Sequence, residues 1–331
     1  MSDKPEGPFK LLSQYKYDPE DAGDDGIYND AGVLVDDDGR VYIYYGFTES
    51  NFNEIDPADM YTIKKGSYKR AVIDDSDNAP QEQRFFEASS PRKIGDTYYL
   101  IYSPCVGSRL AYATSDKPQG PFKYRGYIID NGVDFPGGND HGSVCNINGQ
   151  WYIFYHRHTN GTWYSRQGCA ERLTFGEDGS IFQAEITSCG LNGGPLVGEG
   201  YYPAYLACNL FTNEPSIYVD ERFPKIMQDG RDGDEDPAYL GAIVDGTTVG
   251  FKYFDMKNIH QISIDVRGYI KGSFEVKTAW DGKVLAQIPV EYTNVWKHYS
   301  TPVEMPDGVQ ALYFTFKGEG KGSLKGFYLE H

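Results

Sequence analysis

The sequence predicts an all-β protein, with a β-propeller that is incomplete at its N-terminal end and a β-sandwich behind it. The 331 residues contain 28 Tyr and 38 Gly, a composition that favours strands joined by tight turns. A unit of about 50 residues recurs in the first part of the chain, and alternating strands without this repeat fill the rest. These observations divide the chain into a propeller domain at 1–200 and a sandwich domain at 201–331.

The recurring unit is a strand, a hairpin turn and a strand rich in aromatic residues. In its first copy the strand at 32–35 leads through Asp36-Asp37-Asp38-Gly39 to the aromatic strand at 40–45. The same order returns at 89–102 and at 143–155, and each aromatic strand is followed by a more polar one. Because four short strands per unit are typical of a propeller blade, three complete blades are predicted. They lie at 28–75, 85–130 and 140–190.

A nine-residue motif occurs twice, as S-D-K-P-E-G-P-F-K at Ser2–Lys10 and as S-D-K-P-Q-G-P-F-K at Ser115–Lys123. The second copy closes a blade and leads to its outer strand. The first copy is therefore interpreted as the tail of a blade whose earlier strands are absent. Since a propeller ring takes roughly four or more blades to close, we expect a missing N-terminal segment, or self-association with another chain, to complete it.

The charge balance limits the classes of partner. Lys and Arg number 31 against 48 Asp and Glu, which gives a net charge of −17. Such a surface repels phosphate groups, so nucleic acids and anionic membranes are not expected as partners. The mean hydropathy is −0.55, and no apolar run approaches the roughly 18 residues of a membrane span. No secretory signal precedes Ser2, and a cytoplasmic location is favoured over a secreted one.

The cysteines indicate free thiols rather than disulfides or a zinc site. Their number is odd, and no two of them have C-x-x-C spacing. They are Cys105, Cys145, Cys169, Cys189 and Cys208. Buried free thiols are the expected state.

Between the two predicted domains, residues 191–212 are rich in Gly, Pro and Tyr and are expected to form a linker against the propeller. The acidic stretch at 229–236 spaces its carboxylates somewhat as a calcium loop does, but it lacks the Glu that ends such a loop. A solvated loop and a cation site are both open readings there. Alternating strands then resume and indicate an antiparallel sandwich. They lie at 250–254, 261–266, 273–277 and 310–316.

Three acidic residues come where the innermost strand of a blade begins, at the end that faces the central channel. They are Asp30, Glu87 and Asp140. Phe85, Phe86 and Ala88 flank Glu87 and would partly desolvate it, which raises the pKa of a carboxyl group and keeps it protonated as a general acid must be. The alternative is a carboxylate that caps backbone amides at the end of a strand.

Other polar residues near these strands have both a functional and a structural interpretation. Asp30 either holds the acid or belongs to an ordinary turn, and His141 either lies on the axis and binds a cation or a sugar or is structural. Arg166 follows His156 and His158 closely. Its forked donors suit sugar hydroxyls, and a surface salt bridge is the alternative.

The sequence F-F-E-A-S-S-P-R-K-I-G-D-T-Y-Y-L-I-Y-S at 85–103 resembles the general-acid blade of family 43 glycoside hydrolases. That resemblance implies a five-bladed propeller that hydrolyses arabinofuranosides or xylosides with inversion. The stretch at 30–39 is similar to the family motif whose Asp orients the acid and tunes its pKa. The resemblance therefore implies that Glu87 is the general acid and Asp30 its helper, with Phe86 beside the sugar.

Two further motifs extend the resemblance over about residues 1–210. Residues 139–143, with the aromatic strand at 151–156, are similar to the blade that bears an axial His, which in many members lies near calcium or another cation. The segment at 165–169 resembles the one whose Arg contacts the sugar. The resemblance implies substrate binding by Arg166 and His141, and a cation near His141 as the sole cofactor.

The sequence departs from the family pattern at the general base. The family has an Asp on the first blade, in a context such as A-P-x-V followed by a G-x-Y-Y-L hairpin, and this context is not found here. Inversion needs two carboxyl groups about 6.5–9.5 Å apart, one to protonate the leaving oxygen and one to activate water. Ala31 also stands where many members have Pro.

The C-terminal region resembles a family 6 carbohydrate-binding module, which implies a jelly-roll sandwich. The similar segments are 281–290, 293–299 and 312–318. Trp296 is then either a stacking platform for sugar or a large residue at the edge of the core. The Asn that such modules usually carry near the C-terminus is not evident at 320–326.

We therefore expect an inverting glycoside hydrolase acting on α-L-arabinofuranosyl or β-xylosyl linkages of plant hemicellulose. Its partner would be arabinoxylan or arabino- and xylo-oligosaccharides, with galactofuranosides as a further substrate class. The alternatives are a carbohydrate-binding protein without catalysis, and an enzyme that needs a missing segment or partner chain for its general base.

Overall fold

The computed structural model describes residues 1–13, 28–73, 79–131, 139–213, 223–230 and 238–331. Within these residues the chain forms β-strands and no α-helix, which confirms the predicted all-β class. Two short 3-10 helices occur, η1 (Gly190–Asn192) and η2 (Ala204–Leu206). No helix in the described ranges is long and apolar enough to cross a membrane.

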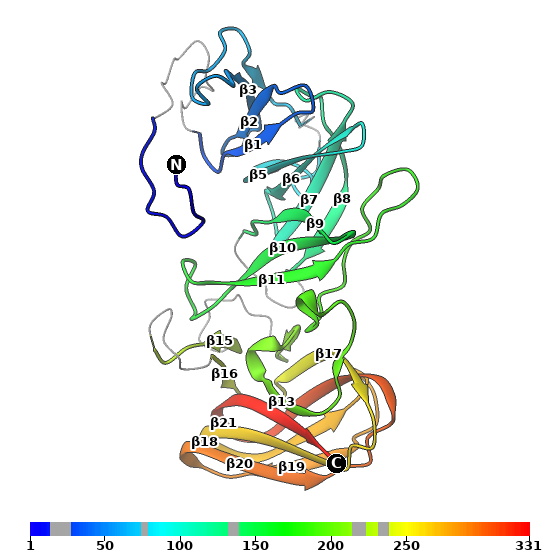
Figure 1. Cartoon of the computed structure of the whole chain (residues 1–331). Helices are drawn as coiled ribbons and strands as arrows, with labels where there is room; N and C mark the ends of the chain where they lie inside the picture. The colour runs from blue at the N-terminus through cyan, green and yellow to red at the C-terminus, as the bar shows by residue number, and fades with distance from the viewer. Residues whose placement is uncertain (14–27, 74–78, 132–138, 214–222, 231–237) are drawn as a thin grey trace.

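The first two sheets are four-stranded antiparallel meanders, as predicted for blades (Figure 1). The first contains β1 (Gly32–Val35), β2 (Val41–Tyr45), β3 (Asn51–Ile55) and β4 (Lys69–Arg70). The second contains β5 (Phe85–Ile94), β6 (Thr97–Pro104), β7 (Arg109–Ser115) and β8 (Lys123–Asp130). The turn between β1 and β2 closes with the Gly39 N–H donating to the Asp36 carbonyl at 2.9 Å. Gly39 has φ +81°, a conformation that glycine adopts readily.

The third sheet has three strands among the described residues, where four were predicted. They are β9 (Ser143–Ile147), β10 (Gln150–His158) and β11 (Arg166–Arg172). After β11 the chain makes a tight turn, in which the Gly176 N–H donates to the Ser180 carbonyl at 2.8 Å. Only an isolated bridge between Phe175 and Ile181 follows. The turn forms inside the stretch that was predicted to supply the fourth strand, so no such strand pairs with β11.

The first strands of the three sheets lie next to one another, as the inner strands of propeller blades do. A Cβ on Gly32 of β1 would lie 2.3 Å from the carbonyl oxygen of Ser89 in β5, so only glycine permits this approach. Arg92 of β5 donates from Nε to the Val144 carbonyl of β9 at 2.9 Å. The predicted arrangement of blades around one axis is therefore present in this part of the chain.

The C-terminal sandwich is one continuous system of ten strands (Figure 1). Its short strands are β12 (Leu196–Val197), β13 (Gly200–Pro203), β14 (Asn209–Phe211), β15 (Lys225–Met227), β16 (Tyr239–Ile243) and β19 (Ala286–Val290). Its long strands are β17 (Thr248–Met256), β18 (Gln261–Lys277), β20 (Thr293–Pro302) and β21 (Gly308–Glu330). The strands predicted at 261–266 and 273–277 are both part of β18, which continues through Gly268 and Gly272 against glycines of β21.

Residues 191–212 are not a free linker. β12 and β14 pair with β17, and β13 pairs with β21, so this segment belongs to the sandwich. It also touches the propeller, because Arg157 of β10 donates to the carbonyls of Ala207 and Tyr205. The boundary drawn between residues 200 and 201 stays a prediction.

Two smaller expectations have different outcomes. The five cysteines form no disulfide, as predicted, but the expected burial holds only for Cys208, and Cys145 is exposed. Most of the acidic loop, at 231–237, lies outside the described residues. Asp229 at its start binds Arg267 at 2.6 Å and accepts a hydrogen bond from Tyr239 at 2.8 Å.

Candidate active site

Glu87 lies at the start of β5, where the strand is irregular. Its register with β6 shifts on both sides of Glu87, and Ala88 has φ +69°, a left-handed conformation that is uncommon for alanine. Such a bulge re-aims side chains relative to a regular strand. Glu87 is only 9% exposed, and Phe86 beside it packs against Phe47 with ring centroids 4.9 Å apart.

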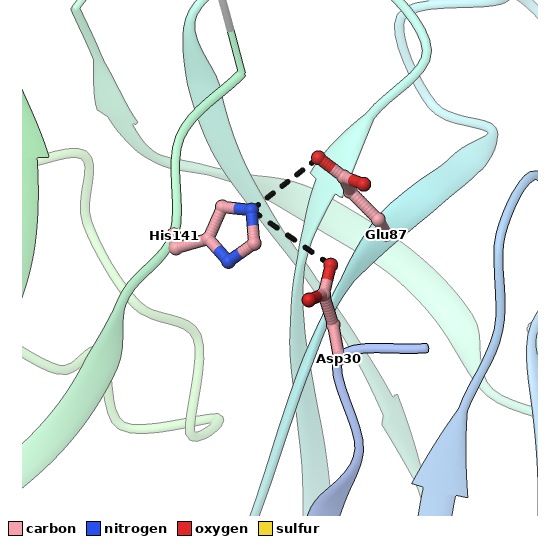
Figure 2. A group of neighbouring side chains, drawn as sticks. All are labelled: Asp30, Glu87 and His141. Atoms are coloured by element: carbon pink, nitrogen blue, oxygen red, sulfur yellow. Dashed lines mark hydrogen bonds and ion pairs between the residues drawn. The ribbon is translucent and has the colours of Figure 1, made fainter. Parts of the chain in front are cut away.

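Asn139, His141 and Asp30 lie around the Glu87 carboxyl group, and Figure 2 shows the last two of these side chains with Glu87. Asn139 donates from Nδ2 to Oε1 of Glu87 and also lies 3.0 Å from Nε2 of His141. His141 Nε2 is 3.3 Å from the same Glu87 oxygen and 3.8 Å from Oδ2 of Asp30. The structure therefore brings Asp30, Glu87 and His141 together from three separate blades.

Asp30 reaches this cluster from the turn before β1. The turn is held by the Gly46 N–H, which donates to the Asn29 carbonyl at 3.0 Å, and Asn29 donates from its side chain to Asp30 Oδ2 at 3.2 Å. Asp30 itself has φ +46°, which aspartate tolerates better than most residues. Its side chain is 31% exposed, against 11% for Glu87.

The spacing of the cluster limits its chemistry. One donor atom from each of Asp30, Glu87 and His141 lies within 4.8 Å of the others. That separation is shorter than the roughly 6.5–9.5 Å that an inverting acid and base need for a water between them. Asp30 is thus placed to orient Glu87 and His141, and it is too near Glu87 to activate that water.

Asp140 does not face the channel, contrary to expectation. It is fully buried, and the His156 N–H donates to its Oδ1 at 3.2 Å. Its other oxygen has no hydrogen-bond partner in the described part of the chain. Because burial outweighs these hydrogen bonds, the pKa of Asp140 is raised well above its ordinary value. The side chain has turned inward to β10, where backbone donors are available.

Four aromatic side chains continue from the cluster through the third blade, and we call them the histidine row. They are His141, His156, His158 and Trp163, with successive ring centroids 5.8, 5.2 and 5.5 Å apart. Burial first, and then the positive charge of Arg166, lowers the pKa of His156 to about 3, so its ring is neutral at pH 7. Arg166 is exposed and lies opposite His158 in the β10–β11 pair, within electrostatic reach of the site.

The other predicted substrate-binding residues lie in different places. Phe86 borders Glu87 directly, whereas Trp296 lies in β20 of the sandwich. There the Arg267 guanidinium is 4.4 Å and the Lys325 ammonium 5.9 Å from the Trp296 ring centroid. A sugar-stacking role for Trp296 stays a prediction, and the ring already has a packing role within its own domain.

Sequence reasoning missed Asn139 and Phe47. Asn139 bonds directly to Glu87, yet in the sequence it stands out only as the neighbour of the Asp140-His141 pair. Phe47 follows β2 and meets Phe86 across two blades. The signal that could have found Asn139 is the run of three polar residues before an inner strand.

Comparisons with known proteins show which families and enzymes this chain is similar to. The model of glycosyl hydrolases family 43 matches residues 1–181. A xylosidase/arabinosidase of Thermoclostridium stercorarium is 46% identical over 362 residues, covering 99% of this chain and 76% of that protein. An arabinoxylan arabinofuranohydrolase of Paenibacillus polymyxa is 28% identical, covering 89% of this chain and 49% of that protein, so this chain spans about half of the second relative's length.

Among solved structures, a family 43 arabinoxylan arabinofuranohydrolase from Bacillus subtilis in complex with cellotetraose aligns with a TM-score of 0.48 and 24% identity. The alignment covers 100% of this chain and 73% of that chain. The family match takes in more than half of the sequence, including all three residues of the cluster. On that match and on the relative with 46% identity, the chain belongs to family 43 of the glycosyl hydrolases.

Proposed function

We propose that this chain carries the acid side of a glycosidase active site that cleaves α-L-arabinofuranosyl or β-xylosyl linkages in plant hemicellulose. The observation that carries the proposal is the Glu87 carboxyl group, which is nearly buried yet bonded to Asn139 and His141 beside Asp30. Relatives named for xylosidase, arabinosidase and arabinofuranohydrolase activities support this substrate class.

Each residue of the cluster then has a defined part. Glu87 protonates the oxygen that leaves the sugar, and Asn139 fixes the orientation of its carboxyl group. His141 contacts the same Glu87 oxygen as Asn139, and Asp30 lies on the other side of the His141 nitrogen and orients that ring. Phe86 and Arg166 contact the sugar itself, the first through its ring and the second through its forked N–H donors.

Replacing Glu87 by Gln tests the acid. Gln keeps the shape and the oxygen that accepts from Asn139, but it has no proton to give. A general acid contributes roughly 10²–10⁴-fold, so E87Q should lose about that much activity on an arabinoxylan oligosaccharide. The loss should be smaller with 4-nitrophenyl α-L-arabinofuranoside, because nitrophenolate leaves with little protonation.

The matched control is E82Q, since Glu82 lies five positions before Glu87 and is exposed. E82Q should keep the wild-type kcat/KM on both substrates. An E87Q enzyme whose rate on the oligosaccharide stays within about tenfold of wild type would refute the assignment.

We include in the proposal a cation bound through His141, but not a cation bound by the whole cluster. Calcium prefers six to eight oxygen ligands, whereas the cluster offers two carboxylates and one imidazole nitrogen. A metal on Glu87 would also keep that carboxylate ionised and prevent it from acting as an acid. His141 Nδ1, which makes no hydrogen bond to the described residues, is the donor that could reach an axial cation without involving Glu87. When bound there, the cation would fix the ring of His141.

A carbohydrate-binding protein without catalysis is the second candidate. The observation that favours it is that the cluster of described residues contains no carboxylate at the distance from Glu87 that an inverting base needs. Calorimetric binding of xylotetraose by wild-type protein that hydrolyses neither nitrophenyl glycosides nor arabinoxylan would support this candidate over the first.

A further inference from the structure

The turn between β10 and β11, residues 159–165, displays two large aromatic side chains at its tip. Trp163 is 40% exposed and Tyr164 is 92% exposed. We call this segment the aromatic turn. Exposed apolar patches often mark binding sites, whereas single exposed apolar residues are normal. Trp163 and Tyr164 are consecutive exposed rings, and neither contacts Glu87.

The aromatic turn is held rigidly by its own hydrogen bonds. The Thr159 N–H donates to the Ser165 carbonyl at 2.9 Å, and the two hydroxyl groups lie 2.8 Å apart. Asn160 donates from Nδ2 to the Ser165 hydroxyl at 2.9 Å. Because the base of the turn is fixed, binding through its rings loses little conformational entropy.

The sandwich holds the same turn from outside. The Asn160 N–H donates to the Ile226 carbonyl of β15 at 2.8 Å, and Asn160 Oδ1 accepts from the Gln228 N–H at 2.9 Å. Gly161 lies against the Lys225 side chain, where an added Cβ would be 3.4 Å from Cδ. The position of the two rings therefore depends on both domains.

The aromatic turn is also connected to the acid. The edge of Trp163 meets the His158 ring, and the histidine row continues from there to His141, which contacts Glu87. Arg166 directly follows the turn. Trp163 thus lies at the outer end of the histidine row that leads to Glu87, and Tyr164 is its exposed neighbour in the chain.

We propose that Trp163 and Tyr164 bind the sugar chain to which the cleaved residue is attached, on the leaving-group side of Glu87. The ligand class is a neutral chain of pyranose rings, whose C–H faces pack on aromatic rings. Exposed rings at the border of the site suit the part of a polymer that stays outside the pocket. A neutral chain also escapes the repulsion that a protein of net charge −17 exerts on anionic polymers.

The inference rests on the proposed function, and a comparison of two substrates tests it. An arabinoxylan oligosaccharide has a main chain, whereas 4-nitrophenyl α-L-arabinofuranoside has none. W163A and Y164A should each shift the ratio of the two kcat/KM values by about tenfold against the oligosaccharide, mainly through KM. Y164A guards against misfolding, because Tyr164 is almost fully exposed. N160A should give a smaller shift in the same direction, since it loosens the turn.

The control is Y269A, because Tyr269 is also highly exposed, at 77%, but lies on β18 of the sandwich. It should leave the ratio within about twofold of wild type. Equal losses on both substrates, or no loss in W163A and Y164A, would overturn the inference.

A binding experiment separates this inference from the proposed function. Calorimetry with xylotetraose in the E87Q background needs no turnover. E87Q should bind it, E87Q/W163A should bind about tenfold more weakly, and E87Q/Y269A should match E87Q. A wild-type chain without hydrolytic activity would refute the proposed function but not this inference. Equal xylotetraose affinity in E87Q and E87Q/W163A would refute this inference but not the proposed function.

Discussion

Glu171 is a buried carboxyl group that joins β11 to the segment leading into the sandwich. It is 4% exposed and accepts from the Thr187 N–H and hydroxyl groups, both at 2.7 Å. The Tyr155 hydroxyl donates to it at 3.4 Å. Burial nevertheless raises the pKa of Glu171 from 4.5 to about 7, because removing the charged form from water outweighs these donors.

This raised pKa predicts a pH dependence of stability. Between about pH 4.5 and 7 the folded protein keeps a proton that the unfolded chain has lost, so the free energy of unfolding falls as pH rises. The contribution is fully present below pH 4.5 and is lost above pH 7, at up to about 1.4 kcal/mol per pH unit. E171Q should reduce this slope by the share of Glu171, because the raised pKa of Asp140 contributes a slope of the same sign in both proteins. Urea unfolding at pH 5 and pH 7.5 measures it, with exposed Glu177→Gln as the control, and parallel changes in wild type and E171Q would contradict it.

The candidate site was predictable where each residue stood at a recognisable position in a repeated unit. Asp30 and His141 lie just before an inner strand and Glu87 lies at the start of one, and they meet because those strands are neighbours. Asn139 was not predictable, since its bond to Glu87 depends on the bulge at Ala88 and on the path of another blade. The burial of the Asp140 side chain was not predictable either, because the sequence does not show that the backbone N–H of His156 lies within its reach.

The bulge at the start of β5 is the local structure that aims Glu87. The bulge requires a left-handed backbone at Ala88. This conformation is unfavourable for residues with a Cβ and most unfavourable for β-branched residues. The Phe86 carbonyl is held by the Thr48 N–H at 2.6 Å, so the neighbouring blade fixes the bulge from outside. The direction of Glu87 is thus a property of two blades.

Substitutions at Ala88 test this bulge. A88G relieves the left-handed strain and should be as stable as wild type or up to about 1 kcal/mol more stable. A88V should be about 1–2 kcal/mol less stable, and it should lose activity beyond that loss because a straightened strand turns Glu87 away. Urea unfolding and kcat on the arabinoxylan oligosaccharide measure both. If A88V kept wild-type stability and rate, the bulge would have no part in aiming the acid.

In the repeated nine-residue motif, the turn forms from the local sequence, whereas the burial of the following Phe depends on packing. In both copies a glycine N–H donates to a lysine carbonyl at 3.1 Å, from Gly7 to Lys4 and from Gly120 to Lys117. Phe122 after the second turn is fully buried between blades, whereas Phe9 after the first is 70% exposed. The turn was therefore predictable from the motif, and the burial of its aromatic residue was not.

The same distinction explains the strands. D-G, G-D and N-G turns, one in each blade, located the hairpins of all three blades, because those turns form from local preference. The sequence did not predict that the third blade has only three strands among the described residues. It also did not predict that β18 is continuous. Gly268 and Gly272 lie between the strands predicted at 261–266 and 273–277, and in β18 they allow close contact with the β21 backbone.

The propeller and the sandwich share an interface with both apolar and polar parts. Cys208 is fully buried in the apolar core of the third blade, while its N–H donates to the Gly250 carbonyl of β17 at 2.8 Å. Arg157 of β10 is 5% exposed and donates to two carbonyls of the sandwich segment, those of Tyr205 and Ala207. The aromatic turn adds a third connection through Asn160. These contacts predict that the two domains unfold together.

Arg157 is the contact whose removal tests this cooperativity. R157A leaves the Tyr205 and Ala207 carbonyls without their donor, at about 1–3 kcal/mol each. Lys cannot replace Arg157, because it lacks the forked donors that reach both carbonyls. R157A and R157K should therefore lower the first unfolding midpoint and split a single calorimetric transition into two, because each domain keeps its own apolar core. Arg125→Ala is the control, since Arg125 makes only a surface ion pair with Asp178 at 2.7 Å and such pairs contribute about 0–1 kcal/mol. A single transition at the wild-type midpoint in R157A would mean that the contacts of Cys208 and Asn160 couple the domains without Arg157.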